Sequence, residues 1–204
     1  MNYQQLFLQV RPNNFLDIGA HDGSFSWEVL KNNPDCDILM IEANPNCEPY
    51  LQKIKRKYEI IGLSSQKGTT KFYIEKVNKI GTGASYLKEN TVWYKGDKSE
   101  EIEIEIDTLD NKNYFPKGMI DLVKIDTQGS ELDILLGGRK TIRRSKYVLL
   151  EVSTIQYNSG APLMDEVIQK MREYEFRVEE ILDYLKFNGN QIVQMDILFK
   201  NMYI

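Results

Sequence analysis

The stretch that most constrains this chain is Phe15 to Gly23, which reads FLDIGAHDG. Its apolar start suits a buried strand, and Gly19 and Gly23 allow a sharp turn that comes close to a ligand. A helix is expected to begin directly afterwards, near Ser24. This order predicts either the corner of a nucleotide-binding or nucleoside-binding sheet, or an ordinary corner in which the glycines only relieve strain.

The acid in this stretch indicates which cofactor such a corner would suit. A dinucleotide-binding loop carries G-x-G-x-x-G, and its amides bind a pyrophosphate. The chain has no such run here, and a carboxylate at Asp17 would repel a pyrophosphate. It would suit a cofactor with a cationic amino-acid end, such as S-adenosylmethionine. The residues that we expect to bind this cofactor are Asp17, Gly19, Ala20, His21 and Gly23.

Composition predicts a globular protein with one core. The chain has 204 residues, of which 42% are hydrophobic and 27% charged, and no linker divides it, so a single domain over residues 1–204 is expected. The net charge of −4 gives no general attraction to nucleic acid. One histidine and two cysteines form neither a Cys/His zinc set nor a disulfide framework. No signal peptide or membrane span is evident, so we expect a cytoplasmic protein without a membrane partner.

The next elements alternate between strands and helices. Asp37 to Glu42 is an apolar strand that ends in an acid, Asn44 caps the helix that follows, and Tyr58 to Leu63 predicts a third strand. This order predicts a parallel, doubly wound sheet with ligands beyond the carboxyl ends of its strands. Glu42 is then placed to accept ribose hydroxyls, although a helix cap or surface charge is the alternative. Ala43, and Ser64 in a loop suited to adenine, complete the expected cofactor site.

A second decisive stretch, Met119 to Gly138, reads MIDLVKIDTQGSELDILLGG. It predicts a fourth buried strand, in which Lys124 and Asp126 share a face, and then a helix with a capping box formed by Ser130 and Asp133. A lone lysine in a strand is costly, so Lys124 is either the structural partner of a carboxylate or part of the site. A functional role is favoured for the two acids in this stretch, Asp126 and Glu131.

The second half of the chain completes the expected sheet. Thr70 to Glu75 and Glu101 to Asp107 predict strands, the latter with a solvated acidic face. Tyr147 to Ser153 predicts a fifth strand of the parallel set, with Glu151 near its end. Phe176 to Glu180 and Gln191 to Phe199 predict an antiparallel pair. The expected fold is therefore a Rossmann-like sheet of about seven strands with a terminal hairpin and helices on both faces. The late hairpin is typical of class I methyltransferases rather than of dehydrogenases.

These residues resemble the FkbM family of S-adenosylmethionine-dependent methyltransferases. The similarity runs from about residue 14 to residue 200, and Lys124-x-Asp126-x-x-Gly129-x-Glu131 is its most specific part. A departure is His21, where the family more often has asparagine. The similar stretches are Phe15 to Ser26, Met40 to Pro45, Ile106 to Asp110, Val123 to Gly138 and Asp196 to Lys200.

The resemblance implies methyl transfer to a hydroxyl oxygen, often that of a sugar or of a secondary-metabolite scaffold, so a small-molecule or glycan acceptor is expected. Lys124, Asp126, Glu131 and Glu151 are then expected to bind and deprotonate the acceptor, and no metal is expected because Lys124 would oppose a cation. Acceptor specificity is expected in Thr69 to Lys117 and in the late loops.

Several alternatives stay open at this stage. They are methylation of a non-sugar metabolite hydroxyl, a non-catalytic S-adenosylmethionine-binding module and, less favoured, an NAD-dependent oxidoreductase. The sequence also leaves open whether the chain forms a homo-oligomer or is one domain of a larger protein.

Overall fold

The computed structural model describes residues 3–88, 98–115, 118–156 and 158–204. In these ranges no helix has the length and apolar character that a membrane crossing requires. The elements, in chain order, are α1 (Tyr3–Val10), β1 (Asn14–Ile18), α2 (Ser24–Asn32), β2 (Asp37–Glu42), the 3-10 helix η1 (Pro45–Cys47), α3 (Glu48–Ile54), β3 (Lys57–Ile60), β4 (Gly62–Leu63), β5 (Gly68–Glu75), β6 (Ser99–Asp107), α4 (Leu109–Lys112), β7 (Ile120–Ile125), α5 (Glu131–Gly137), α6 (Arg139–Arg143), β8 (Ser145–Ser153), α7 (Met164–Glu173), β9 (Phe176–Phe187) and β10 (Gln191–Asn201).

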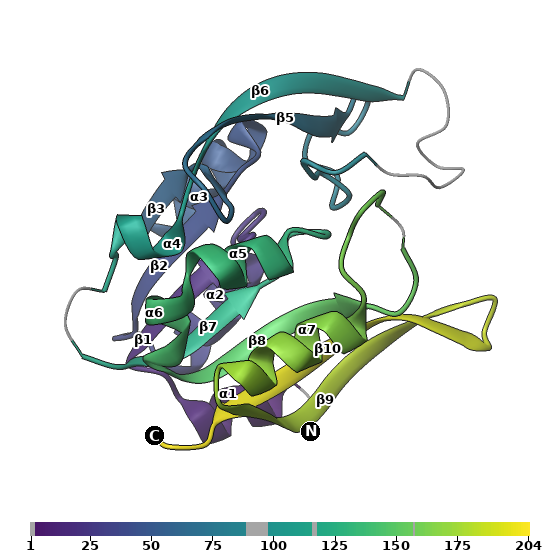
Figure 1. Cartoon of the computed structure of the whole chain (residues 1–204). Helices are drawn as coiled ribbons and strands as arrows, with labels where there is room; N and C mark the ends of the chain where they lie inside the picture. Colours follow the sequence, from purple (N-terminus) through teal and green to yellow (C-terminus); the bar gives the residue numbers. More distant parts are fainter. Residues whose placement is uncertain (1–2, 89–97, 116–117, 157) are drawn as a thin grey trace.

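A seven-stranded sheet in the order β3-β2-β1-β7-β8-β10-β9 forms the centre of the molecule (Figure 1). The pairs from β3 to β8 are parallel, whereas β10 runs antiparallel to both β8 and β9. The chain moves outward from β1 to β3 and then returns to the other side of β1 at β7. This reversal places a topological switch point between β1 and β7, where ligands of doubly wound sheets bind. The expected sheet with its terminal hairpin is confirmed.

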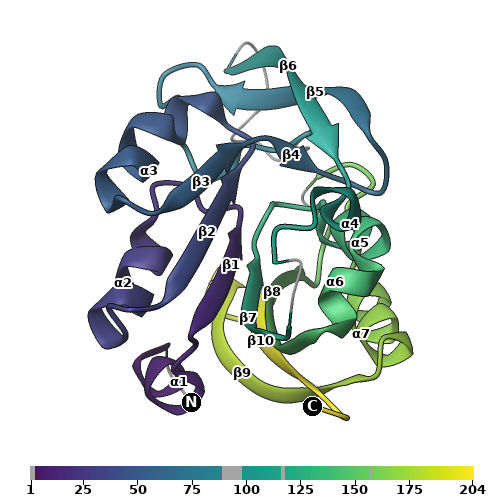
Figure 2. The same cartoon turned by 90° about the vertical axis from the view of Figure 1, so that its left-hand side faces the viewer.

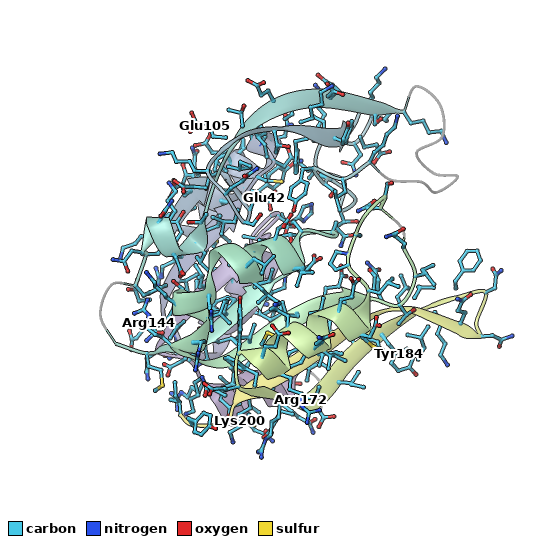
Figure 3. The ribbon with its side chains drawn as sticks, in the orientation of Figure 1. Glu42, Glu105, Arg144, Arg172, Tyr184 and Lys200 are labelled. Atoms are coloured by element: carbon cyan, nitrogen blue, oxygen red, sulfur yellow. The ribbon has the colours of Figure 1, made fainter. Side chains whose placement is uncertain are left out.

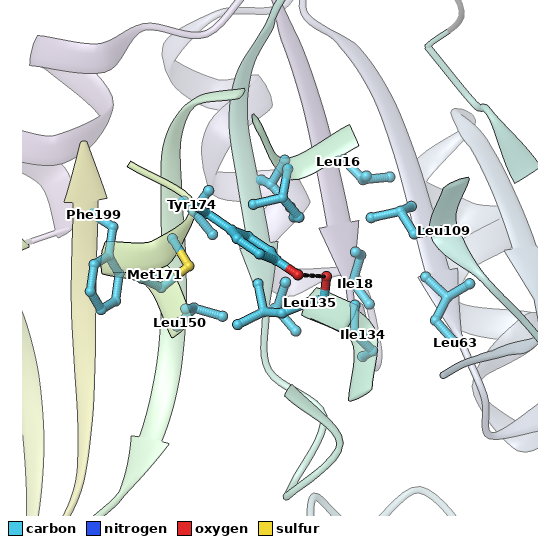
Figure 4. Close-up of a cluster of buried hydrophobic side chains, with 14 of the residues drawn as sticks. Leu16, Ile18, Leu63, Leu109, Ile134, Leu135, Leu150, Met171, Tyr174 and Phe199 are labelled. Atoms are coloured by element: carbon cyan, nitrogen blue, oxygen red, sulfur yellow. Dashed lines mark hydrogen bonds between the residues drawn. The ribbon is translucent and has the colours of Figure 1, made fainter. Parts of the chain in front are cut away.

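Alternating side chains of β1 explain why helices cover both faces of this sheet. Phe15 packs with buried residues of α1, α2 and α3, whereas Leu16 and Ile18 pack on the other face with α5, α6 and α7. Figure 2 shows the two groups of helices on opposite sides of the strands. Tyr174 is buried in the core on the Leu16 face of the sheet. Its hydroxyl donates a 3.0 Å hydrogen bond to the Leu135 carbonyl oxygen (Figure 4), so the polar end of the side chain is satisfied.

A smaller sheet in the order β4-β6-β5 lies beyond the carboxyl ends of β1 and β2 (Figures 1 and 2). Its strands β5 and β6 contain the two strands predicted in this region. The prediction of one strand from Tyr58 to Leu63 is wrong, because the chain leaves the large sheet after Ile60 and then pairs with β6. A Cβ atom on Gly62 would lie 2.8 Å from the Ile106 side chain, so glycine permits this close approach.

Candidate active site

A cavity of about 620 Å³ lies at the carboxyl ends of β1, β2 and β7, and the smaller sheet forms part of its wall. Near β2 the lining is mainly apolar, with side chains from both sheets. Near β7 and β8 it is polar. The apolar lining includes Ile61, Leu63, Phe72 and Ile104, and the polar lining includes Lys124, Asp126, Gln128, Glu151 and Gln194.

The loop after β1 reaches the cavity because glycine lets it pack on the loop after β7. Gly19 has a φ of +76°, and a Cβ atom there would lie 1.8 Å from the Asp126 carbonyl oxygen. The amides of Gly19 and Ala20 both donate to the Ile41 carbonyl oxygen, at 2.9 and 3.0 Å. Three predicted residues, Gly19, Ala20 and His21, therefore line the cavity together.

Two other predicted cofactor residues, Asp17 and Gly23, lie behind the cavity wall. Gly23 has a φ of +79°, and a Cβ atom there would lie 2.9 Å from Ile54 of α3. Asp17 is fully buried and accepts a 2.6 Å hydrogen bond from the Ser26 hydroxyl through Oδ2. Its Oδ1 atom has no hydrogen-bond partner in the described part of the chain. Burial raises the pKa of Asp17, although the neighbouring Lys124 opposes this.

Glu42 joins the loop after β1 to the loop after β2, at the β2 side of the cavity. Its two carboxylate oxygens accept the backbone amides of His21 and Asn44, both at 2.8 Å. Burial raises the pKa of Glu42, and these amides oppose the rise. Glu42 and Ala43 line the cavity, as the sequence predicts, and Figure 3 shows Glu42 in the interior and Glu105 at the edge of the molecule. Each carboxylate oxygen keeps a lone pair for a ligand hydroxyl.

The segment after β5 crosses the loops that carry His21 and Asn44. The His21 Nε2 atom lies 2.5 Å from the Ile80 carbonyl oxygen, and the Asn44 side-chain amide donates to Lys79 at 2.7 Å. No motif in the sequence predicts these contacts. Of the region expected to set acceptor specificity, residues 89–97 and 116–117 lie outside the described residues.

Ser64 does not line the cavity, although the residues just before it do. It is 6% exposed and packs against α5, where a Cβ atom on Gly137 would lie 2.1 Å from its carbonyl oxygen. Of the loop expected to hold adenine, Gly62 and Leu63 line the wall, together with Ile61 just before it.

Lys124 and Asp126 form an ion pair with 2.8 Å between Nζ and Oδ2. The Lys124 ammonium also lies 5.2 Å from the centre of the Phe25 ring. Burial lowers the pKa of Lys124, but the carboxylates of Asp126 and Asp17 outweigh it and the net pKa is raised. Burial raises the pKa of Asp126, but Lys124 outweighs it and the net pKa is lowered. The structural pair considered for Lys124 thus exists, and both of its members line the cavity.

Glu151 on β8 faces the same polar region. Its Oε2 atom accepts hydrogen bonds from the side-chain amides of Gln128, at 2.5 Å, and Gln194, at 3.1 Å. Burial, with smaller contributions from Asp126 and Asp196, raises the pKa of Glu151 to about 9. The sequence reasoning missed both glutamines because a neutral amide carries no recognisable spacing motif.

Glu131 occupies a different position from the one predicted. It is 5% exposed, does not line the cavity, and accepts the backbone amides of Thr127 and Gly129, both at 3.0 Å. The predicted capping box is wrong: Ser130 makes no side-chain capping bond, and Asp133 instead accepts a hydrogen bond from the Tyr86 hydroxyl. Glu131, the first residue of α5, therefore holds the loop between β7 and α5 in place through these amides.

Comparisons with known proteins show which family the chain resembles. The family model described as the methyltransferase FkbM domain matches residues 17–178. A 2-O-methyltransferase, NoeI of Sinorhizobium fredii (strain NBRC 101917 / NGR234), is 23% identical over 176 residues, 78% of this chain and 71% of that protein. Methyltransferase sdnD of Sordaria araneosa is 26% identical over 165 residues, 62% of this chain and 61% of that protein.

Solved structures show the same fold at low sequence identity. Methyltransferase FkbM from Methylobacillus flagellatus KT has a TM-score of 0.58 and 13% identity, over 93% of this chain and 44% of that one. Magnesium protoporphyrin IX methyltransferase (ChlM) from Synechocystis PCC 6803, solved with bound S-adenosylmethionine, has a TM-score of 0.53 and 8% identity, over 97% and 77%. This chain therefore spans less than half of the first structure and about three fifths of sdnD. With the family model covering residues 17–178, the chain belongs to the FkbM family of S-adenosylmethionine-dependent methyltransferases, as the sequence resemblance predicts.

Proposed function

We propose that this methyltransferase methylates a hydroxyl oxygen of a sugar or glycan. The observation that carries the proposal is the polar end of the cavity, where an ammonium, two carboxyl groups and two amides line one space. Such groups match the donors and acceptors of several neighbouring hydroxyls. Aromatic side chains of Tyr3, Phe7 and Phe25 line the same cavity and suit the apolar face of a sugar ring. The name of the relative NoeI, a 2-O-methyltransferase, supports oxygen as the acceptor atom.

The residues that line the cavity near β1 and β2 suit the methyl donor. The backbone from Gly19 to His21, which lines the cavity, would hold its methionine part, and Glu42 would accept its ribose hydroxyls. The apolar lining, including Ile61 and Phe72, would enclose its adenine. When bound, S-adenosylmethionine supplies a methyl group from a sulfonium, so the acceptor oxygen forms the new carbon–oxygen bond and the electron pair of the broken carbon–sulfur bond stays on sulfur. Asp17, behind the wall, accepts a hydrogen bond from the Ser26 hydroxyl and so joins β1 to α2.

The polar residues orient the acceptor. Asp126, held ionised by Lys124, accepts a hydrogen bond from the acceptor hydroxyl and fixes the direction of its lone pair. Asp126→Asn removes the negative charge while keeping the shape, and we expect it to lower kcat about 100-fold. Affinity for S-adenosylhomocysteine, measured by calorimetry, should change less than about threefold. Unchanged turnover would remove Asp126 from its assigned role.

The reaction is tested with radiolabelled S-adenosylmethionine and a panel of methyl glycosides and simple hydroxylated metabolites. Transfer to glycosides supports the proposal, and transfer only to the other metabolites would overturn the sugar assignment. Binding of S-adenosylhomocysteine without transfer to any acceptor would favour a non-catalytic binding module. We expect EDTA to leave the rate unchanged, because the Lys124 ammonium opposes a cation at Asp126.

A further inference from the structure

Two carboxyl groups share a hydrogen-bond donor in the polar end of the cavity. Asp126 follows β7, Glu151 lies on the neighbouring strand β8, and the side-chain amide of Gln128 donates to both, to Glu151 Oε2 at 2.5 Å and to Asp126 Oδ1 at 3.4 Å. Two ionised carboxylates on one donor repel each other in a buried site, and a proton on one of them removes this repulsion. We therefore expect the pair to hold one proton between its members.

The surrounding charges indicate which group carries this proton. Lys124 on β7 pairs directly with Asp126, which stabilises the ionised form of Asp126. Glu151 instead faces further acids: burial is the largest cause that raises its pKa, followed by Asp126, then Asp196 on β10 and Glu131 on α5. Around Asp196 lie the Tyr3 hydroxyl of α1 and Asp183 of β9. Glu151 therefore holds the proton at neutral pH.

Two glutamines fix the orientation of Glu151. Gln128 and Gln194 both donate to Oε2, which leaves Oε1 as the atom that carries the proton. Gln128 has a φ of +56°, which a residue other than glycine adopts infrequently. Its carbonyl oxygen accepts hydrogen bonds from Ser85 at 2.9 Å and Asn158 at 2.5 Å, so two further segments hold it in this conformation.

We propose that Gln128 and Gln194 are positioning residues that direct the proton of Glu151 toward Asp126, and that the two carboxyl groups receive the proton of the acceptor hydroxyl as one unit. This inference rests on the proposed function. As the acceptor oxygen is methylated, its O–H bond breaks and the proton passes to Asp126. The pair changes from one shared proton to two, and water removes the added proton before the next turnover.

The first test needs no acceptor. Carboxyl ¹³C resonances of the free protein are followed against pH, and those of the pair are identified by their loss in Glu151→Gln and Asp126→Asn. We expect Glu151 to titrate near pH 9. Gln194→Leu removes a donor to the ionised form and should raise this pKa by about 0.5 or more, whereas Gln191→Leu, on the exposed end of the same strand, should not. Titration of Glu151 near pH 4 to 5, or no effect of Gln194→Leu, would overturn the inference.

The second test measures turnover with a methyl glycoside acceptor. Gln194→Leu should lower kcat about tenfold, leave KM for S-adenosylmethionine within about twofold, and move the pH profile in the direction seen by NMR. A change in KM alone would contradict a positioning role. If Glu151 titrates as expected but no hydroxyl is methylated, the proposed function fails and the placement of the Glu151 proton by the two glutamines stands. If methylation occurs while Glu151 titrates normally, only this inference fails.

Discussion

Glu42 uses one carboxylate both to hold two loops and to face the cavity. Its loss should remove charged hydrogen bonds to the cofactor ribose, worth about 1.5–3 kcal/mol. We therefore expect Glu42→Ala to weaken S-adenosylhomocysteine binding by about tenfold or more in calorimetry. Glu105→Ala, at the edge of the molecule (Figure 3), is the matched control and should leave the affinity unchanged. Equal affinities for the wild-type protein and Glu42→Ala would remove the ribose assignment.

Gly19 is required by geometry more than by any ligand. A Cβ atom there would overlap the Asp126 carbonyl oxygen, and the φ of +76° is costly for other residues. We expect Gly19→Ala to lower the free energy of unfolding by about 2 kcal/mol or more in urea denaturation. Gly68→Ala is the control, because nothing lies within 4 Å of its Cβ position and its φ is not positive. Similar losses in both variants would show that the close approach of the two loops is unimportant.

The loop between β7 and α5 depends on Glu131 as an internal brace. In Glu131→Gln the side chain keeps a carbonyl oxygen for the Thr127 and Gly129 amides, but it can no longer act as a base. Glu131→Gln should therefore retain at least about half of the wild-type turnover, whereas Glu131→Ala should cost about 1–3 kcal/mol of stability. Turnover assays and urea denaturation of both variants distinguish these roles. A loss of about 100-fold in turnover for Glu131→Gln, with stability retained, would restore the catalytic role that the sequence predicts.

Helices and strands with a clear hydrophobic pattern were predictable from the sequence, whereas contacts between loops were not. Apolar runs such as Ile120–Ile125 identify the central strands because their side chains are buried on both faces. The break between Ile60 and Gly62 carries no such signal, since Ile60, Ile61 and Leu63 form one apolar run across it. Gln128 illustrates the same limit at the site: its position depends on contacts from Ser85 and Asn158, which are distant in sequence.

The whole molecule joins its two sheets through shared packing. Ile61, Leu63 and Leu109, which lie at or beside the smaller sheet, belong to the same buried cluster as Leu16 of β1. The close approach of Gly137 to the Ser64 backbone also packs α5 against the β4 side of that sheet. We therefore propose that residues 1–204 fold as one domain. The cavity lies between the sheets, so this shared packing also fixes the distance between its apolar and polar ends.

The buried acid at Glu151 makes the stability of the whole molecule depend on pH. Its pKa in the folded protein is about 9, against an ordinary value of 4.5, so from pH 5 to 9 the unfolded chain loses this proton while the folded chain keeps it. This group therefore favours unfolding increasingly as pH rises through that range. Glu151→Gln copies the protonated acid: its carbonyl oxygen can accept from Gln128 and Gln194, and its amide is an uncharged donor in place of the acid proton.

We expect Glu151→Gln and the wild-type protein to have similar stability at pH 5. At pH 8 the variant should be more stable by on the order of 2 kcal/mol, a value reduced for contact with solvent in the cavity. For a chain of this length such a gain raises Tm by about 5 °C. Urea and thermal denaturation at both pH values measure the difference, with Gln191→Leu as a variant whose pH dependence should match that of the wild-type protein. A stability gap that is the same at pH 5 and pH 8 would mean that Glu151 does not keep its proton in the folded state.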